Sequence, residues 1–119
     1  MKIFVFGSNT RGIHGAGAAK EARLKHGAVW GVGEGMMGSS YAIPTKDRDL
    51  KPRTLEEIRA SVETFKAFAR EMLDVPGMIF EVTRVGCGLA GFTDNQIAPM
   101  FADAPHNCAL PPAWEPYRR

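Results

Sequence analysis

A single lysine, Lys46, follows an apolar run at the point where a strand should give way to a charged loop. The stretch reads YAIPTKDRDL from 41 to 50. A lysine amine that has lost its proton is a nucleophile, and a charged one pairs with phosphate. However, the neighbouring Asp47, Arg48 and Asp49 are typical of a solvated charge run. Lys46 is therefore either an ordinary surface residue or a group that points into a site.

Two glycine-rich loops have the composition of an anion-binding site. The first, GSNTRGIHGAG, begins at Gly7, and the second, GCGLAG, begins at Gly86. Glycine lets backbone N–H groups approach an anion closely, and a helix N-terminus favours negative charge. Since each loop follows an expected strand and precedes an expected helix, the pair indicates a diphosphate site. A pair of tight turns would explain the glycines equally well, and neither loop has the GK[ST] signature of a triphosphate-binding loop.

Three side chains in these loops have both a binding and a structural interpretation. Asn9 could bind a ligand hydroxyl, although capping a turn is the commoner use of such an asparagine. His14 could polarise a ligand or lie exposed on its loop. Cys87 is expected to pack rather than react, because no histidine adjoins it in the sequence. The sequence contains no recognisable catalytic triad or metal-ligand spacing, so we expect no metal and no cofactor.

Alternating strands and helices must position these residues. Apolar and β-branched runs predict strands at 2–6, 29–31, 40–44, 78–85 and 107–111, the second of them only a stub. Alanines and long straight side chains predict a helix over 18–27, ended by Gly27. This alternation favours an α/β sheet with helices on both faces.

The clearest predicted helix covers 54–73. Thr54 and Glu57 form a T-x-x-E capping box, and an apolar stripe recurs at steps of three and four residues, which predicts a face buried in the core. Thr93 and Gln96 offer a second capping box, but Pro99 limits that helix to a few turns.

Composition predicts one small domain spanning 1–119, with a loosely packed proline-rich end from about 111. The chain is 45% hydrophobic and carries a formal charge of +2, with basic and acidic residues intermixed. This charge does not by itself indicate nucleic-acid binding, and it does not argue against a nucleotide-sized anion. Two cysteines, no signal peptide and no membrane-length apolar run predict a cytoplasmic protein with reduced thiols and no membrane partner.

The order and spacing of several stretches resemble the macrodomain family over nearly the whole chain. The stretches are FVFGSN, HGAGAAKEARLKHGA, YAIPTK, the capped helix and VTRVGCGLAGF. They are most similar to terminal ADP-ribose glycohydrolases and DNA ADP-ribosylation antitoxin macrodomains, which have a strand ending in T-K and a late G-C-G loop. The resemblance implies a compact three-layer α/β/α fold with a mixed central sheet and a cleft that holds ADP-ribose.

The resemblance also implies which residues contact the ligand. Asn9 would lie near the distal ribose, and Phe92 would pack against a ring or sugar, or belong to the core. The first loop would lie beside the distal ribose and diphosphate through His14, Gly15, Ala16 and Gly17. The second loop would enclose the diphosphate from the other side through Gly86, Cys87, Gly88, Leu89, Ala90 and Gly91.

In this subfamily the lysine of the T-K motif is taken as the nucleophile, and Lys46 occupies its place. An amine must be neutral to attack the anomeric carbon of the distal ribose, so burial or a nearby positive charge such as Arg48 or Arg84 would have to favour the unprotonated form.

The sequence departs from the pattern of some relatives at Ala90, where they carry an acidic residue after G-C-G-L. The antitoxin-like members are similar to this chain in having a small residue there. The proton donor is then unassigned, with Asp94 and Asp47 as the substitutes that the sequence offers.

The resemblance thus predicts an ADP-ribosyl hydrolase acting on modified nucleic acid, ADP-ribosylated DNA in particular, or on modified protein. One alternative is a non-catalytic module that binds ADP-ribose, with Lys46 paired to a phosphate. Another is a small structural or inhibitory protein with degenerate loops. The chain is shorter than a usual macrodomain, so either its sheet edge is short or a second copy covers it, and both monomer and dimer stay open.

Overall fold

A mixed five-stranded sheet forms the middle layer of the protein. The computed structural model describes residues 1–117. The strands are β1 (Lys2–Asn9), β2 (Gly35–Met37), β3 (Ser40–Lys46), β4 (Ile79–Val82) and β5 (Cys108–Ala109). Their order is β2-β3-β1-β4-β5; β1 runs parallel to β3 and β4, β4 is parallel to β5, and β2 is antiparallel to β3. The long central strand β1 therefore ends between two parallel neighbours.

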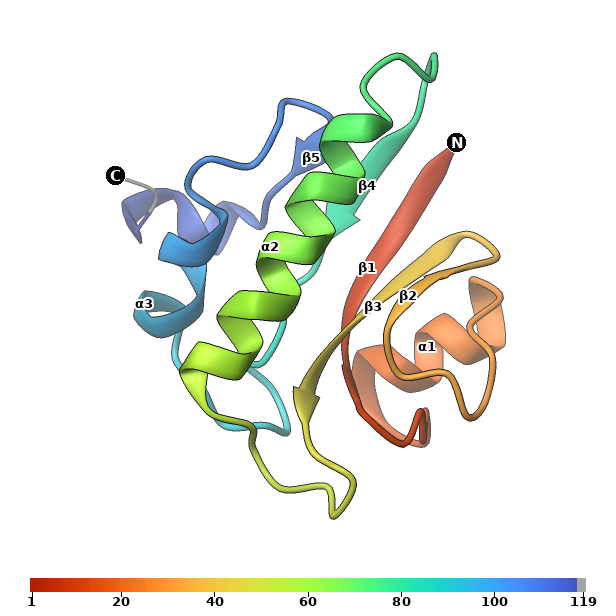
Figure 1. Ribbon diagram of the computed structural model, residues 1–119, viewed down its shortest axis with the longest axis vertical. Coiled ribbons are helices and arrows are strands. Elements are labelled where there is room, and N and C mark those ends of the chain that lie inside the picture. Colours follow the sequence, from red (N-terminus) through yellow and green to blue (C-terminus); the bar gives the residue numbers. More distant parts are fainter. Residues whose placement is uncertain (118–119) are drawn as a thin grey trace.

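Helices cover both faces of this sheet, as the sequence predicts (Figure 1). The helix α1 (Gly17–Lys25) lies on one side and α2 (Leu55–Glu71) on the other. The shorter helices on the α2 side are α3 (Asp94–Ile97), η1 (Ala98–Phe101) and η2 (Pro112–Tyr117). The predicted three-layer α/β/α architecture is confirmed.

The alternation of side chains along β1 builds two cores. Ile3 and Val5 point into the larger core, which α2 covers. Phe6 points into a smaller core with Ala19 and Ala22 of α1, whose small side chains let the helix lie close to the sheet. Burial on both faces explains why β1 reads as a continuous apolar run.

The capping box starts α2 where the sequence predicts it. The Glu57 N–H donates to the Thr54 hydroxyl at 3.1 Å, and the Thr54 N–H donates to the Glu57 carboxylate at 3.0 Å. Two N–H groups without helical acceptors are thereby satisfied. Ile58, Val62 and Phe65 carry the predicted stripe into the core.

The strand stub predicted at 29–31 is wrong. The edge strand lies later, at β2, and residues 29–32 form a turn instead. Periodicity could not locate β2, because a strand of three residues is too short to show a pattern and is defined by its pairing with β3. The two edge strands, β2 and β5, have three and two residues, so the exposed edges are short.

The expectation of a loosely packed end is also wrong for residues 112–117. Trp114 is fully buried, packs against Phe101 with ring centroids 5.1 Å apart, and donates its indole N–H to Asp94 at 2.8 Å. One large aromatic residue anchors a segment whose prolines alone predict loose packing. The remaining two residues of that prediction, 118–119, lie outside the described residues.

Both cysteines, Cys87 and Cys108, are free thiols. Within residues 1–117, no helix combines the length and the apolar character needed to cross a membrane.

Candidate functional site

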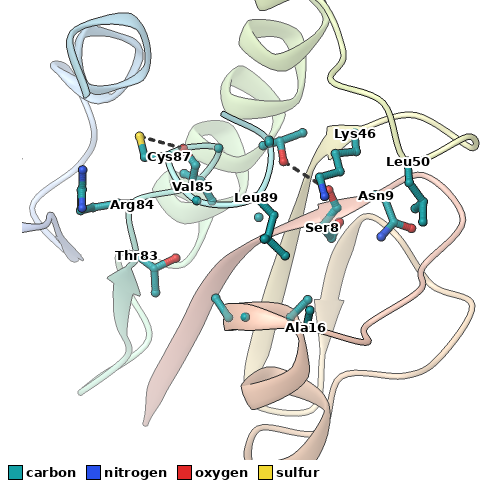
Figure 2. A pocket seen from close by; sticks show the side chains of 18 of the residues that line it. Ser8, Asn9, Ala16, Lys46, Leu50, Thr83, Arg84, Val85, Cys87 and Leu89 are labelled. Carbon is teal, nitrogen blue, oxygen red and sulfur yellow. Dashed lines mark hydrogen bonds between the residues drawn. The ribbon is translucent and has the colours of Figure 1, made fainter. Parts of the chain in front are cut away.

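A cleft of about 690 Å³ opens at the carboxyl ends of the central strands. Its walls are the loop that follows β1, the end of β3 and the loop that follows β4 (Figure 2). Open α/β sheets bind ligands at this position, where neighbouring parallel strands lead their chains to opposite faces.

The cleft brings together most of the residues that the sequence predicts for the site. Lys46 and Asn9 line it, as do three residues of the first loop and five of the second: Gly15, Ala16, Gly17, Gly86, Cys87, Gly88, Leu89 and Ala90. The lining does not include His14, Gly91 or Phe92. Two loops that are far apart in sequence therefore face one cavity.

Lys46 enters the cleft at the end of β3. Its backbone pairs with Asn9 at a register shift in the β1–β3 ladder, and its carbonyl accepts the Thr10 N–H at 3.0 Å. The side chain is half-buried, and no hydrogen bond or ion pair joins its amine to any other residue between 1 and 117. The amine is thus available to a ligand.

The two arginines expected to assist Lys46 have other surroundings. Arg48 is exposed on the loop after β3. Arg84 lines the cleft, but its guanidinium forms a two-point ion pair with Asp94, at 2.9 and 2.8 Å. Figure 2 places Arg84 and Lys46 at opposite sides of the close-up. The charge of Arg84 is thus compensated by Asp94, and Arg48 faces solvent.

The loop after β3 places a leucine, Leu50, at the mouth of the cleft. The Asp47 carboxylate accepts the N–H groups of Asp49 and Lys51 at 2.8 and 3.0 Å and so closes a tight turn. Leu50 is held in the left-handed region, with φ of 62°, and its side chain is 42% exposed while lining the cleft. A leucine pays roughly 1–2 kcal/mol for this conformation. The sequence offered one signal, a lone apolar residue in a charged run.

Asn9 closes the first loop on itself. Its amide nitrogen donates to the Ile13 carbonyl at 2.8 Å, and its amide oxygen accepts the Ile13 N–H at 2.9 Å. The turn-capping interpretation is therefore confirmed, while the same side chain forms part of the cleft wall.

His14 is neither exposed nor directed at the cleft. It is fully buried, and its Nε2 lies 3.0 Å from the Val29 carbonyl and 2.9 Å from the Val32 carbonyl. Two carbonyl acceptors require a proton on Nε2. Nδ1 has no hydrogen-bond partner within residues 1–117. His14 therefore connects the first loop to the turn at residues 29–32 and does not line the cleft.

The N-terminus of α1 faces the cleft without a side-chain cap. Ala16 is the N-cap residue, no acidic side chain lies in the first turn, and Gly17 starts the helix with φ of 58°. Both residues line the cleft. The first N–H groups of a helix seek acceptors and favour negative charge, so this end is suited to an anionic ligand group.

The second loop is held by backbone bonds and by packing on the larger core. The Phe92 N–H donates to the Gly86 carbonyl at 2.8 Å, and the Phe92 ring lies 3.4 Å from where a Cβ on Gly86 would be. Phe92 thus belongs to the core, one of its two expected roles. At Gly88 a Cβ would meet nothing within 4 Å, so the loop leaves open space toward the cleft there.

Cys87 is a packing residue, as predicted. Burial, and to a smaller extent the nearby Asp94 carboxylate, raise the pKa of its thiol to about 11. The thiol stays protonated at neutral pH and is a poor nucleophile.

The substitute proton donors have structural tasks instead. Hydrogen bonds from Arg84 hold the pKa of Asp94 below its usual range, and the Trp114 indole N–H acts in the same direction. Asp94 is thus ionised at neutral pH and does not line the cleft. The Asp47 carboxylate accepts the two N–H groups that close the turn after β3. None of the described residues lining the cleft is an aspartate, a glutamate or a histidine.

Within residues 1–117, no three His, Cys, Asp or Glu side chains lie close enough together to hold a metal ion.

Comparisons of the chain with models of known protein families, with curated proteins and with solved structures each gave no match. The macrodomain resemblance therefore stays a prediction.

Proposed function

We propose that the chain binds ADP-ribose in the cleft and hydrolyses the bond between ADP-ribose and an attached macromolecule, with Lys46 as nucleophile. The observation that carries this proposal is the meeting of two glycine loops and an unpaired lysine in one cavity. Its volume falls within the roughly 300–1,000 Å³ of small-molecule sites. The resemblance to macrodomains suggests ADP-ribose as the ligand, and the size and lining of the cleft support the proposal.

In this proposal the two loops bind the diphosphate and Lys46 performs the chemistry. The uncapped N-terminus of α1 and the second loop face the cleft from two sides, which suits an anion between them. The unprotonated Lys46 amine forms a bond to the anomeric carbon of the distal ribose. The bond from this carbon to the macromolecule breaks, its electron pair leaves with the departing atom, and that atom takes up the proton that the Lys46 nitrogen releases. Water then hydrolyses the adduct and restores the amine.

The macromolecule is nucleic acid or protein in this proposal. ADP-ribosylated DNA follows from the similarity to the antitoxin macrodomains, and a modified protein carboxylate would present the same anomeric carbon to Lys46.

A non-catalytic ADP-ribose-binding module is the second candidate, and one observation favours it. No carboxylate or imidazole is found among the described residues of the cleft wall, so the wall offers the departing group neither of the side chains that most often serve as general acid. Lys46 would then pair with a phosphate as a charged ammonium group.

Calorimetric titration with ADP-ribose, with ADP and AMP as controls, tests the ligand. Preferential binding of ADP-ribose is the expected result, because only this ligand also offers a distal ribose to the Asn9 and Lys46 side of the cleft. Absence of binding by all three nucleotides would contradict both candidates and favour a structural or inhibitory protein.

The variant Lys46→Ala then separates the two candidates, with Lys51→Ala as the matched control. Lys51 is exposed on the same loop and does not line the cleft. For the hydrolase, Lys46→Ala should lower turnover of ADP-ribosylated DNA or protein at least about 1,000-fold while ADP-ribose binding persists. Wild-type protein that binds and never turns over either substrate would establish the binding module.

A further inference from the structure

A tryptophan, Trp30, stands on the surface of the turn between α1 and β2. Its side chain is 57% exposed, and its neighbours Val29 and Val32 are 53% and 39% exposed. Tryptophan is large and mainly apolar, so such residues are usually buried or used in binding. The cleft does not include this turn.

The backbone beneath the turn forces these side chains outward. The buried His14 ring donates to the carbonyls of both Val29 and Val32, and the Gly31 N–H donates to the Gly12 carbonyl at 2.8 Å. A Cβ on Gly12 would lie 2.3 Å from the Gly31 carbonyl carbon, so the two backbones are in direct contact. No space is left for an apolar side chain to turn inward. The exposure of Trp30 is therefore built into the fold.

A guanidinium group covers one face of the Trp30 ring. The Arg23 Cζ lies 5.6 Å from the ring centroid, and the Arg23 Nε–H donates to the His14 carbonyl at 3.1 Å. This is the geometry of a cation–π contact. Because the ring is still more than half exposed, Trp30 presents an open aromatic surface beside a fixed positive charge.

Charge is distributed unevenly along the chain, with a basic part at residues 1–53 and an acidic part at 54–119. Residues 1–53 contain nine Lys and Arg against four Asp and Glu, whereas 54–119 contain six against nine, giving formal charges of +5 and −3. The first part forms β1, α1, β2 and β3, and thus carries Trp30. Four exposed cations lie on α1 or on the loop before it and have no carboxylate partner within 1–117: Arg11, Lys20, Arg23 and Lys25.

We propose that Trp30 and these four cations bind single-stranded nucleic acid. A base would stack on the exposed part of the Trp30 ring, while Arg23 and its neighbours contact backbone phosphates. An aromatic platform within a basic surface is how single strands are bound without sequence preference. A duplex offers no free base face, and the basic charge beside Trp30 does not suit an apolar protein partner. This inference is independent of the proposed function, since it concerns unmodified nucleic acid.

Intrinsic fluorescence tests this surface directly. The chain has two tryptophans, and Trp114 is fully buried, so stacking of a base should quench Trp30 selectively. Titration with an oligothymidylate of about 12 nucleotides should quench the emission, and the affinity should fall as salt is raised. In a parallel anisotropy assay with labelled oligothymidylate, Trp30→Ala should weaken binding about tenfold and Trp30→Phe should restore most of it.

Matched variants on the acidic part of the chain serve as controls. Leu73→Ala removes an exposed apolar side chain and Arg59→Ala an exposed cation, and both should leave the affinity unchanged. Arg23→Gln should weaken binding and reduce its salt dependence. The proposal is overturned by absence of binding, by equal affinity for a duplex of the same length, or by Trp30→Ala binding like the wild type. Tighter binding of polyglutamate than of oligothymidylate would also overturn it.

Discussion

At the scale of single residues, two lysines show how the fold treats charge. The Lys66 amine is almost fully buried, but it donates to the Met100 carbonyl at 2.7 Å and pairs with Glu63 and Asp103. Its hydrogen-bonding capacity is thereby satisfied, which makes its burial tolerable. Lys46 is half-buried and lacks any such partner within the described chain. This contrast makes Lys46, not Lys66, the lysine available for binding or chemistry.

Asp94 should make the protein sensitive to acid. Its pKa is lowered in the folded state, chiefly by the Arg84 hydrogen bonds. The unfolded chain therefore binds the proton more readily. The resulting stabilisation is present above the unfolded pKa and is lost as the pH falls through the folded pKa. Asp94→Asn should consequently lower the urea midpoint at pH 7 and have a smaller effect at about pH 2, below the usual aspartate range.

Asp74→Asn is the control for this comparison. Asp74 is exposed, and no hydrogen bond or ion pair involving its side chain occurs within 1–117. Its replacement should change the midpoint little at either pH. A loss in Asp94→Asn of the same size at both pH values would show that packing of Trp114, and not the charge of Asp94, is the main contribution.

At the scale of elements, the loop after β4 is expected to tolerate change without loss of the fold. Gly88 has open space where a Cβ would be, and its φ is not in the left-handed region. Gly88→Glu should therefore fold like the wild type and, on the proposed function, weaken ADP-ribose binding by placing a negative charge beside the diphosphate. Calorimetry would measure the loss, and Gly88→Ala, with a neutral methyl group, should bind nearly normally. Unchanged affinity of Gly88→Glu would remove this loop from the site.

Local signals predicted the elements where they were strong. The capping box of Thr54 and Glu57 and the apolar stripe behind it located α2, and the continuous apolar run located β1. The edge strand β2 was missed, because Gly35, Met36 and Met37 carry no pattern and their pairing depends on β3. Long, regular elements are determined by their own residues, whereas short edge strands are determined by their neighbours.

The site likewise combines features that local sequence indicates with features that depend on contacts between distant residues. Glycine-rich loops after two strands left a shared anion site and a pair of tight turns as equal interpretations, and both loops line the cleft. Glycine spacing could not predict that His14 would turn away to bind the carbonyls of Val29 and Val32, because those acceptors lie in another turn. The left-handed Leu50 depends on a carboxylate that closes its own loop. Both details follow from contacts that exist only once the chain is folded.

At the scale of the whole molecule, the two proposed binding surfaces share the loop that follows β1. Asn9 contributes to the cleft, while Gly12, a little further along the same loop, contacts the turn that carries Trp30. The capping bonds from Asn9 to Ile13 span the residues between the two surfaces. A nucleic-acid strand bound at Trp30 would thus lie against the same loop that forms one wall of the cleft.

The C-terminal segment should be required for the stability of the larger core. Trp114 packs against Phe101 and donates a hydrogen bond to Asp94, which is itself paired with Arg84, so the segment connects η1, α3 and the chain after β4. Trp114→Ala should lower the free energy of unfolding by about 3–5 kcal/mol, the usual cost of removing a buried aromatic side chain. Urea unfolding followed by circular dichroism measures this, with Trp30→Ala as an exposed tryptophan control that should cost little. If both variants unfolded at the wild-type midpoint, the segment would contribute nothing to the core. A large loss confined to Trp114→Ala would instead show that one side chain is enough to anchor a proline-rich end.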